Sequence, residues 1–124
     1  MKIETITENN IRIALVKSSE TLIMNVESAL DFIATVSYET GSAAVVVNKE
    51  AVDESFFDLR TGIAGEIIQK FVNYRMKLAI IGDFSGYDSK SLKDFIYECN
   101  NGKDLFFFSD EGEAVKKLKE VAAN

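Results

Sequence analysis

The sequence predicts a single α/β domain with a mixed, mostly parallel sheet, and three observations support this prediction. The chain has 124 residues, of which 47% are hydrophobic and 27% charged, a balance that suits one packed core. Short apolar runs rich in β-branched residues alternate with segments of helical periodicity. A hairpin pattern precedes them. We therefore expect one domain over residues 1–124, with the element order ββαβαβαβα and helices flanking both faces of the sheet.

The chain begins with the pattern of an antiparallel hairpin. Residues 2–7 combine polar residues with Ile3 and Ile6, and an apolar run follows over 11–17. Glu8, Asn9 and Asn10 lie between them. Asparagine tolerates the positive φ angles that tight hairpin turns require, so we expect two antiparallel strands here.

A strand–helix–strand pattern follows the hairpin. Apolar residues recur at helical spacing at Val26, Ala29, Leu30, Ile33 and Ala34. Asn25 or Ser19 is a candidate N-cap for this helix, and Gly41 lies just beyond its end. Residues 43–47 form a continuous β-branched run, which is typical of a strand covered on both faces.

The same pattern then repeats along the chain. Apolar residues at helical spacing over 63–72 predict a second helix, and 77–81 reads as another buried strand. A third helix is expected to begin at Ser89 and to end before Gly102. The last strand is expected over 103–108.

A final helix is expected to follow this strand, with Ser109 as its N-cap. Its apolar positions are Val115, Leu118 and Val121, which recur at helical spacing.

Composition excludes several classes of function. The sequence has no histidine, which excludes Ser-His-Asp and Cys-His catalysis and histidine-based zinc sites. Cys99, the only cysteine, shares an apolar helical stripe with Leu92, Phe95 and Ile96, so we expect an inert core thiol. A net charge of −6 disfavours nucleic acid and anionic membranes as partners. No apolar run approaches the length of a membrane span and no signal core is visible, so we expect a cytoplasmic location.

The segment 56–65 is the most informative part of the chain. It leads from the buried strand over 43–47 into the second helix. Thr61 and Gly62 are therefore expected at the N-terminal end of this helix, near the carboxyl edge of the sheet. The first N–H groups of a helix lack partners and carry partial positive charge, so this geometry suits an anion, a phosphorylated hydroxyl or a docking partner.

Four segments together resemble a known bacterial family. They read YETG at 38–41, VNKEA at 47–51, FFDLRTGIAG at 56–65 and IGDFS at 81–85. They are similar to the uncharacterised bacterial proteins grouped as domain of unknown function 4180. This resemblance covers nearly the whole chain and implies no particular activity.

More remotely, the element order and the turn at 58–62 look like the STAS domain, which sulphate transporters and anti-sigma-factor antagonists share. In those antagonists a short motif of aspartate, serine and glycine opens the second helix, and a partner kinase phosphorylates its serine or threonine. By position, Thr61 matches the phosphoacceptor, Gly62 the following glycine and, across a gap, Asp58 the acid. The resemblance implies a regulatory, non-enzymatic interaction module whose protein partner is a kinase or an anti-sigma-type regulator.

Two roles for Thr61 fit the sequence. As an N-cap, its hydroxyl would stabilise the second helix by about 1 kcal/mol. As a regulated hydroxyl, it would carry a phosphate that the helix dipole and the adjacent Arg60 favour. The loop that holds Asp58, Arg60, Thr61 and Gly62 is the predicted contact surface in either case.

Acidic residues offer a second hypothesis from a different class. Asp58, Asp83 and Asp110 each follow a predicted strand, and ligands of open α/β folds bind at the carboxyl edge of the sheet. Their convergence could hold Mg²⁺, and a small-molecule or Mg²⁺-assisted enzyme would use Asp58, Asp83 and Ser85. A concave pocket with converging polar groups would favour this enzyme, and a flat edge would favour the interaction module. Turn and cap roles explain the same aspartates, so the sequence predicts no metal site and no cofactor.

Two features of the loop have structural and functional interpretations. We expect at least one of Phe56 and Phe57 to anchor the loop in the core, the alternative being an exposed docking patch. We expect Gly62 and Gly65 to serve helix entry and packing, the alternative being close approach of a ligand.

Overall fold

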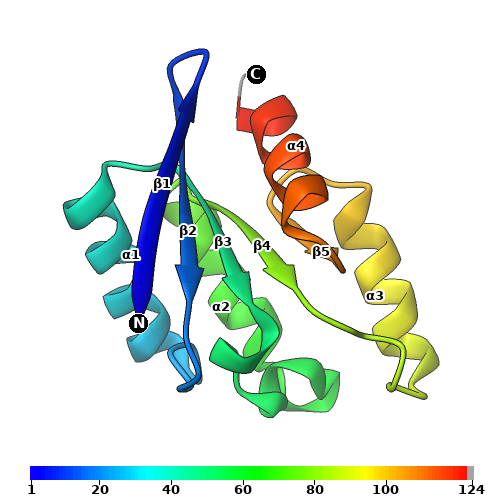
Figure 1. Ribbon diagram of the computed structural model, residues 1–124. Coiled ribbons are helices and arrows are strands. Elements are labelled where there is room, and N and C mark those ends of the chain that lie inside the picture. The colour runs from blue at the N-terminus through cyan, green and yellow to red at the C-terminus, as the bar shows by residue number, and fades with distance from the viewer. Residues whose placement is uncertain (123–124) are drawn as a thin grey trace.

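The five strands follow one another in sequence order across a single sheet in the computed structural model, which describes residues 1–122 (Figure 1). They are β1 (Lys2–Glu8), β2 (Ile11–Lys17), β3 (Ala44–Asn48), β4 (Lys77–Ile81) and β5 (Leu105–Phe108). β1 pairs antiparallel with β2, and the other three pairings are parallel. The predicted mixed, mostly parallel sheet is confirmed.

Four helices connect or follow the strands: α1 (Val26–Thr40), α2 (Ile63–Asn73), α3 (Lys90–Asn100) and α4 (Glu111–Ala122). α1, α2 and α3 pack on one face of the sheet, because right-handed crossovers between strands in sequence order always return on the same side. α4 covers the other face (Figure 1). The predicted helices on both faces are confirmed.

Strand residues alternate between two buried layers. Val45 and Val47 face α1, α2 and α3, whereas Ala44 and Val46 face α4. Both sets have 1% exposure or less, which explains why the β3 sequence is continuously apolar.

The hairpin has the predicted asparagine turn. Asn9 and Asn10 adopt φ angles of 52° and 66°, which the mirror-image hairpin turns require. The β1–β2 register runs without a bulge from Lys2 opposite Lys17 to Glu8 opposite Ile11.

The ends of α1 follow the expected rules. Asn25, rather than Ser19, is the N-cap, and its side chain forms a capping box with Ser28. Gly41 ends the helix in the left-handed conformation with φ 66°. The last turn of α1 has no basic residue of its own, and Nη1 of Arg12 in β2 donates to the carbonyl of Thr40 at 2.8 Å instead.

Two expectations near the C-terminal end need correction. Ser89 caps α3 as predicted, but Ser109 does not cap α4: Oδ1 of Asp110 accepts from the N–H of Gly112 at 2.6 Å and of Glu113 at 3.3 Å. β5 begins at Leu105 rather than at residue 103, because residues 101–104 form the turn that follows α3.

None of the helices within residues 1–122 is both long enough and apolar enough to cross a membrane.

Candidate functional site

Two loops form the carboxyl edge of the sheet after β3 and β4. The β3–α2 loop contains three short 3₁₀ turns, η1 (Lys49–Ala51), η2 (Glu54–Phe57) and η3 (Leu59–Thr61). The β4–α3 loop spans 82–89. β3 and β4 are neighbours in the sheet, with Asn48 opposite Ile81, so the two loops leave the sheet side by side.

An aromatic cluster joins these loops to the core. The ring centroid of Phe57 lies 5.8 Å from that of Phe84 and 5.4 Å from that of Tyr87. Phe107 of β5 packs beneath, 6.4 Å from Phe57 and 5.3 Å from Phe84. Phe56 and Phe57 are 1% and 4% exposed, so both anchor the loop and the alternative of an exposed aromatic pair is wrong.

Polar groups lock the same two loops together. The hydroxyl of Tyr87 donates to the carboxylate of Glu54, at 2.9 and 3.1 Å from its two oxygens. Nζ of Lys49 lies 3.2 Å from the same carboxylate and 5.1 Å from the centroid of the Tyr87 ring. We call Lys49, Glu54 and Tyr87 the loop latch.

The latch has a defined protonation state near neutral pH. Burial raises the pKa of the Tyr87 phenol, which therefore stays a neutral donor. The neighbouring Tyr87 hydroxyl raises the pKa of Lys49, against an opposing effect of burial, so Lys49 stays a cation. Gly82 leaves room for this lysine, because a Cβ at position 82 would lie 2.7 Å from Cβ of Lys49.

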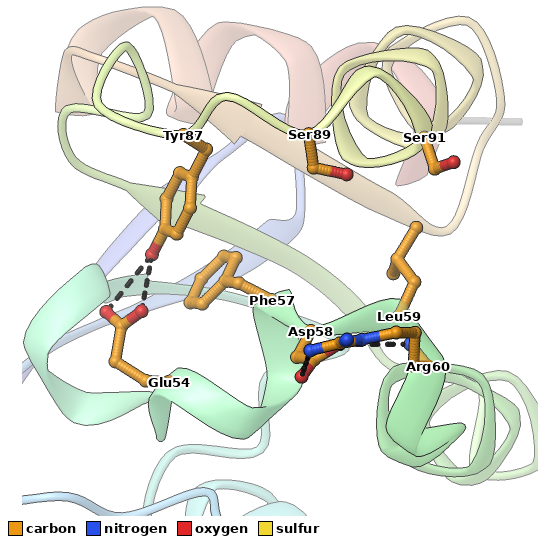
Figure 2. A pocket seen from close by; sticks show the side chains of 8 residues that line it. All are labelled: Glu54, Phe57, Asp58, Leu59, Arg60, Tyr87, Ser89 and Ser91. Atoms are coloured by element: carbon orange, nitrogen blue, oxygen red, sulfur yellow. Dashed lines mark hydrogen bonds and ion pairs between the residues drawn. The ribbon is translucent and has the colours of Figure 1, made fainter.

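An open cleft of about 630 Å³ lies between the β3–α2 loop and the start of α3 (Figure 2). Figure 2 shows the hydroxyls of Ser89 and Ser91 on one side and the Asp58–Arg60 pair on the other. The residues that line the cleft are Glu54, Phe57, Asp58, Leu59, Arg60, Tyr87, Ser89 and Ser91. Apolar, charged and hydroxyl groups therefore face one concave surface.

Asp58 and Arg60 form a two-pronged ion pair on the rim of the cleft. Nε of Arg60 lies 2.9 Å from Oδ1 of Asp58, and Nη2 lies 3.0 Å from Oδ2. Hydrogen bonding to Arg60 lowers the pKa of Asp58. The Arg60 side chain is 91% exposed, so solvent screens this pair and its guanidinium is accessible to a partner.

Thr61 is exposed, but it is not the N-cap of α2. Gly62 occupies that position with φ 74°, a conformation that glycine adopts without strain. The Thr61 hydroxyl lies 3.0 Å from the carbonyl oxygen of Ser55 and 2.8 Å from that of Asp58, and it accepts from the N–H of Ile63 at 3.2 Å. Thr61 therefore ties η2, η3 and the start of α2 together.

Asp83 and Ser85 bond to each other in a local turn and do not line the cleft. Oδ1 of Asp83 accepts from the Ser85 N–H at 2.9 Å and from its hydroxyl at 2.6 Å, and the latter bond lowers the Asp83 pKa. Asp110 caps α4. Residues 1–122 contain no group of three or more His, Cys, Asp or Glu side chains placed to hold a metal ion, so the convergence of Asp58 with Asp83 and Asp110 is not found.

The sequence pointed to two of the charged residues that line the cleft and missed its other polar residues. Asp58 and Arg60 line it as proposed, whereas Glu54, Tyr87, Ser89 and Ser91 were not singled out for it. One sequence signal could have indicated the contact between the two loops. Lys49 directly follows β3, and Gly82 directly follows the neighbouring strand β4. The expected packing role of Gly65 is wrong, since a Cβ at that position would meet nothing within 4 Å.

Comparison with known proteins assigns the chain to a family. The model of the domain of unknown function DUF4180 matches residues 8–118. The chain belongs to this family. No curated protein and no solved structure matches it, so the remoter STAS-like resemblance receives no support from these comparisons. The DUF4180 match includes both loops of the cleft, so the site lies inside the family domain.

Proposed function

We propose that this DUF4180 domain is a protein-docking module that holds a segment of a partner protein in the cleft beside α3. The observation that carries the proposal is the lining of this open cleft, where apolar and charged side chains share one surface between two loops that the latch and the aromatic cluster fix in place. A surface whose shape is set before binding loses little conformational freedom on association.

The groups at the cleft have the composition of a protein interface. Leu59 and the small exposed part of Phe57 supply apolar surface in the cleft, and Glu54, Asp58 and Arg60 supply charged groups beside it. Interfaces combine an apolar centre with a polar rim, and exposed arginines are enriched among the residues that dominate binding.

We further propose that phosphorylation of Thr61 regulates this docking, with a kinase or an anti-sigma-type regulator as the partner. A phosphorylated Thr61 has no proton to donate to the carbonyls of Ser55 and Asp58, and it adds a charge of about −1.5 to −2. The phosphate would compete with Asp58 for the Arg60 guanidinium. The rim of the cleft would therefore rearrange.

A site-specific photocross-linking experiment tests the docking surface. A benzophenone amino acid replaces Arg60 on the rim of the cleft or, as the control, Tyr97, which is 71% exposed on α3. We expect a protein from the native host to cross-link from position 60 and not from position 97. Equal cross-linking from both positions would show that the cleft has no special role.

The switch is tested with four proteins: the wild type, Thr61→Ser, Thr61→Ala and Thr61→Asp. Thr61→Ser retains the hydroxyl and should behave as the wild type. If Thr61 is a switch, Thr61→Asp stays folded and changes the amount of partner cross-linked from the cleft. Identical partner profiles for all four folded proteins would leave Thr61 with a purely structural role.

The concave shape of the cleft is what we expected of an enzyme rather than of an interaction module, so it favours a second candidate, a small-molecule or Mg²⁺-assisted enzyme that uses Asp58. Isothermal titration calorimetry with Mg²⁺, Mn²⁺ and Zn²⁺ separates the two functions. The docking proposal expects no tight metal binding. A micromolar Mg²⁺ signal that Asp58→Ala or Asp83→Ala removes would favour the enzyme instead.

A further inference from the structure

The two edge strands of the sheet, β1 and β5, differ in whether a side chain covers their outer backbone groups. β5 is a short strand of four residues, and the side chain of Asn100 in α3 pairs with its backbone. Oδ1 of Asn100 accepts from the N–H of Phe107 at 2.7 Å, and Nδ2 donates to the carbonyl of Phe107 at 3.1 Å. These backbone groups would otherwise be open to another chain, so Asn100 protects this edge.

β1 forms the opposite edge and has no such protection within residues 1–122. It is seven residues long, pairs with β2 along its whole length without a bulge, and contains no proline. The sheet ends at β1, so one row of its backbone N–H and C=O groups has no strand beside it. Long, regular and uncovered edge strands are templates for pairing with another strand.

We propose that β1 pairs with β1 of a second copy of this chain, joining the two sheets into one continuous sheet across a two-fold axis. A closed two-fold dimer requires the two strands to run antiparallel, with the same surface on both copies. Residues directly opposite each other then point to the same face of the sheet.

Charge and the length of strand overlap together select one register of this pairing. If Thr5 lies on the two-fold axis, Lys2 lies opposite Glu8 of the second copy, and the symmetry repeats this favourable pair. If the axis moves to Glu4, that carboxylate faces its own copy. If it moves to Ile6, Glu4 faces Glu8. Like charges directly opposite each other are unfavourable. An axis at Ile3 would also place Lys2 opposite a carboxylate, that of Glu4, but it would pair only three residues of each β1 strand. The register centred on Thr5 is therefore the complementary one that pairs the whole of β1.

The side chains concerned are accessible. Lys2 and Glu8 are exposed at the edge, and their ion pairs within the chain, with Glu4 and Lys119 respectively, lie at the surface, where such pairs contribute little. They can therefore turn towards a second copy at little cost. Ile3 and Ile6 of β1 are partly buried against the two cores of their own chain and hold the strand in place.

Sedimentation velocity of the full chain, over a wide range of concentrations, gives the first test. We expect a monomer–dimer equilibrium. Lys2→Glu alone or Glu8→Lys alone should weaken the dimer by roughly ten-fold, because each places like charges opposite each other twice. The double variant Lys2→Glu/Glu8→Lys should restore it. Circular dichroism confirms that each variant is folded.

Disulfide trapping tests the register. In a Cys99→Ala background, Thr5→Cys places two introduced thiols opposite each other, with Cα atoms about 4.5–5.5 Å apart, close enough for a disulfide. Thr7→Cys is the matched control on the same face of the strand, and its thiol lies roughly 13 Å along the strand from its equivalent. We expect mild oxidation to give a covalent dimer from Thr5→Cys only.

Three outcomes would overturn the proposal. The first is a monomer at every concentration. The second is a dimer that neither charge reversal affects. The third is equal trapping at positions 5 and 7, which would show that the strands do not hold the register centred on Thr5.

Discussion

Gly82 allows the side chain of Lys49 to reach Glu54 and Tyr87, its partners in the loop latch. A Cβ at position 82 would lie 2.7 Å from Cβ and 3.1 Å from Cδ of Lys49, so Gly82→Ala must displace the lysine. Overpacking of this kind typically costs about 1–3 kcal/mol, and we expect that loss in the free energy of unfolding measured with urea. Gly86→Ala, in the same loop, is the control, because its Cβ would meet nothing within 4 Å. Equal stability of the two variants would contradict this role of Gly82.

Cys99 is packed against the main core on α3. Burial raises the pKa of its thiol to about 11, with a smaller contribution from Glu98. Near neutral pH the reactive thiolate is therefore scarce, and we expect slow labelling by a chromogenic disulfide reagent, with a rate that rises with pH towards the thiol pKa. A matched exposed thiol on the same helix, Lys93→Cys in a Cys99→Ala background, should react much faster. Similar rates at neutral pH would contradict an inert core thiol.

At the scale of the element, α4 begins with an aspartate rather than with the serine before it. Asp110 accepts from two backbone N–H groups of the first turn, whereas Ser109 is exposed and makes no such bond. Asp110→Ala should lower the free energy of unfolding by about 1 kcal/mol, because it leaves those groups without their acceptor and removes a negative charge from the helix N-terminus. Ser109→Ala should change it by less than about 0.5 kcal/mol. Urea denaturation of both variants measures the difference, and the reverse order would show that Ser109 is the cap.

At the N-terminal ends of α2 and α4, two neighbouring residues are each plausible N-caps from the sequence. Thr61 and Gly62 are adjacent, as are Ser109 and Asp110, and in each pair the residue expected to be the cap is not. At Gly62 the positive φ angle decides the outcome, since glycine reaches it without the strain that threonine would have.

For the whole molecule, α4 is the single helix that covers the second face of the sheet within residues 1–122. Leu118 is fully buried there, against strand residues such as Phe106 and Val46. Leu118→Ala should lower the free energy of unfolding by about 2–5 kcal/mol, because it removes apolar contacts and leaves a cavity that no second helix can fill.

Urea denaturation with Lys116→Ala as the control measures this effect. Lys116 is exposed on the same helix, and its replacement should change stability by no more than about 0.5 kcal/mol. If Leu118→Ala costs no more than the control, packing of α4 does not hold the second face of the sheet together.

The sequence by itself determined the elements and their order. Asn9 and Asn10 mark the hairpin turn, Asn25 and Gly41 mark the two ends of α1, and the continuous β-branched run of β3 marks a strand covered on both faces. These signals act between residues that are close along the chain, through φ preferences, caps and apolar spacing. The right-handed crossover then places α1, α2 and α3 on one face of the sheet, whereas α4 follows the last strand and belongs to no crossover.

Only the tertiary structure decided which distant side chains meet. Tyr87 and Glu54 are 33 residues apart, and they meet because β3 and β4 are neighbours whose register sends their loops out together. The Asp58–Arg60 side of the cleft is local and was found from the sequence. The serines of α3 and the protection of β5 by Asn100 depend on how α3 packs. Contacts of this kind are set by strand register and helix packing, which no local pattern in the chain encodes.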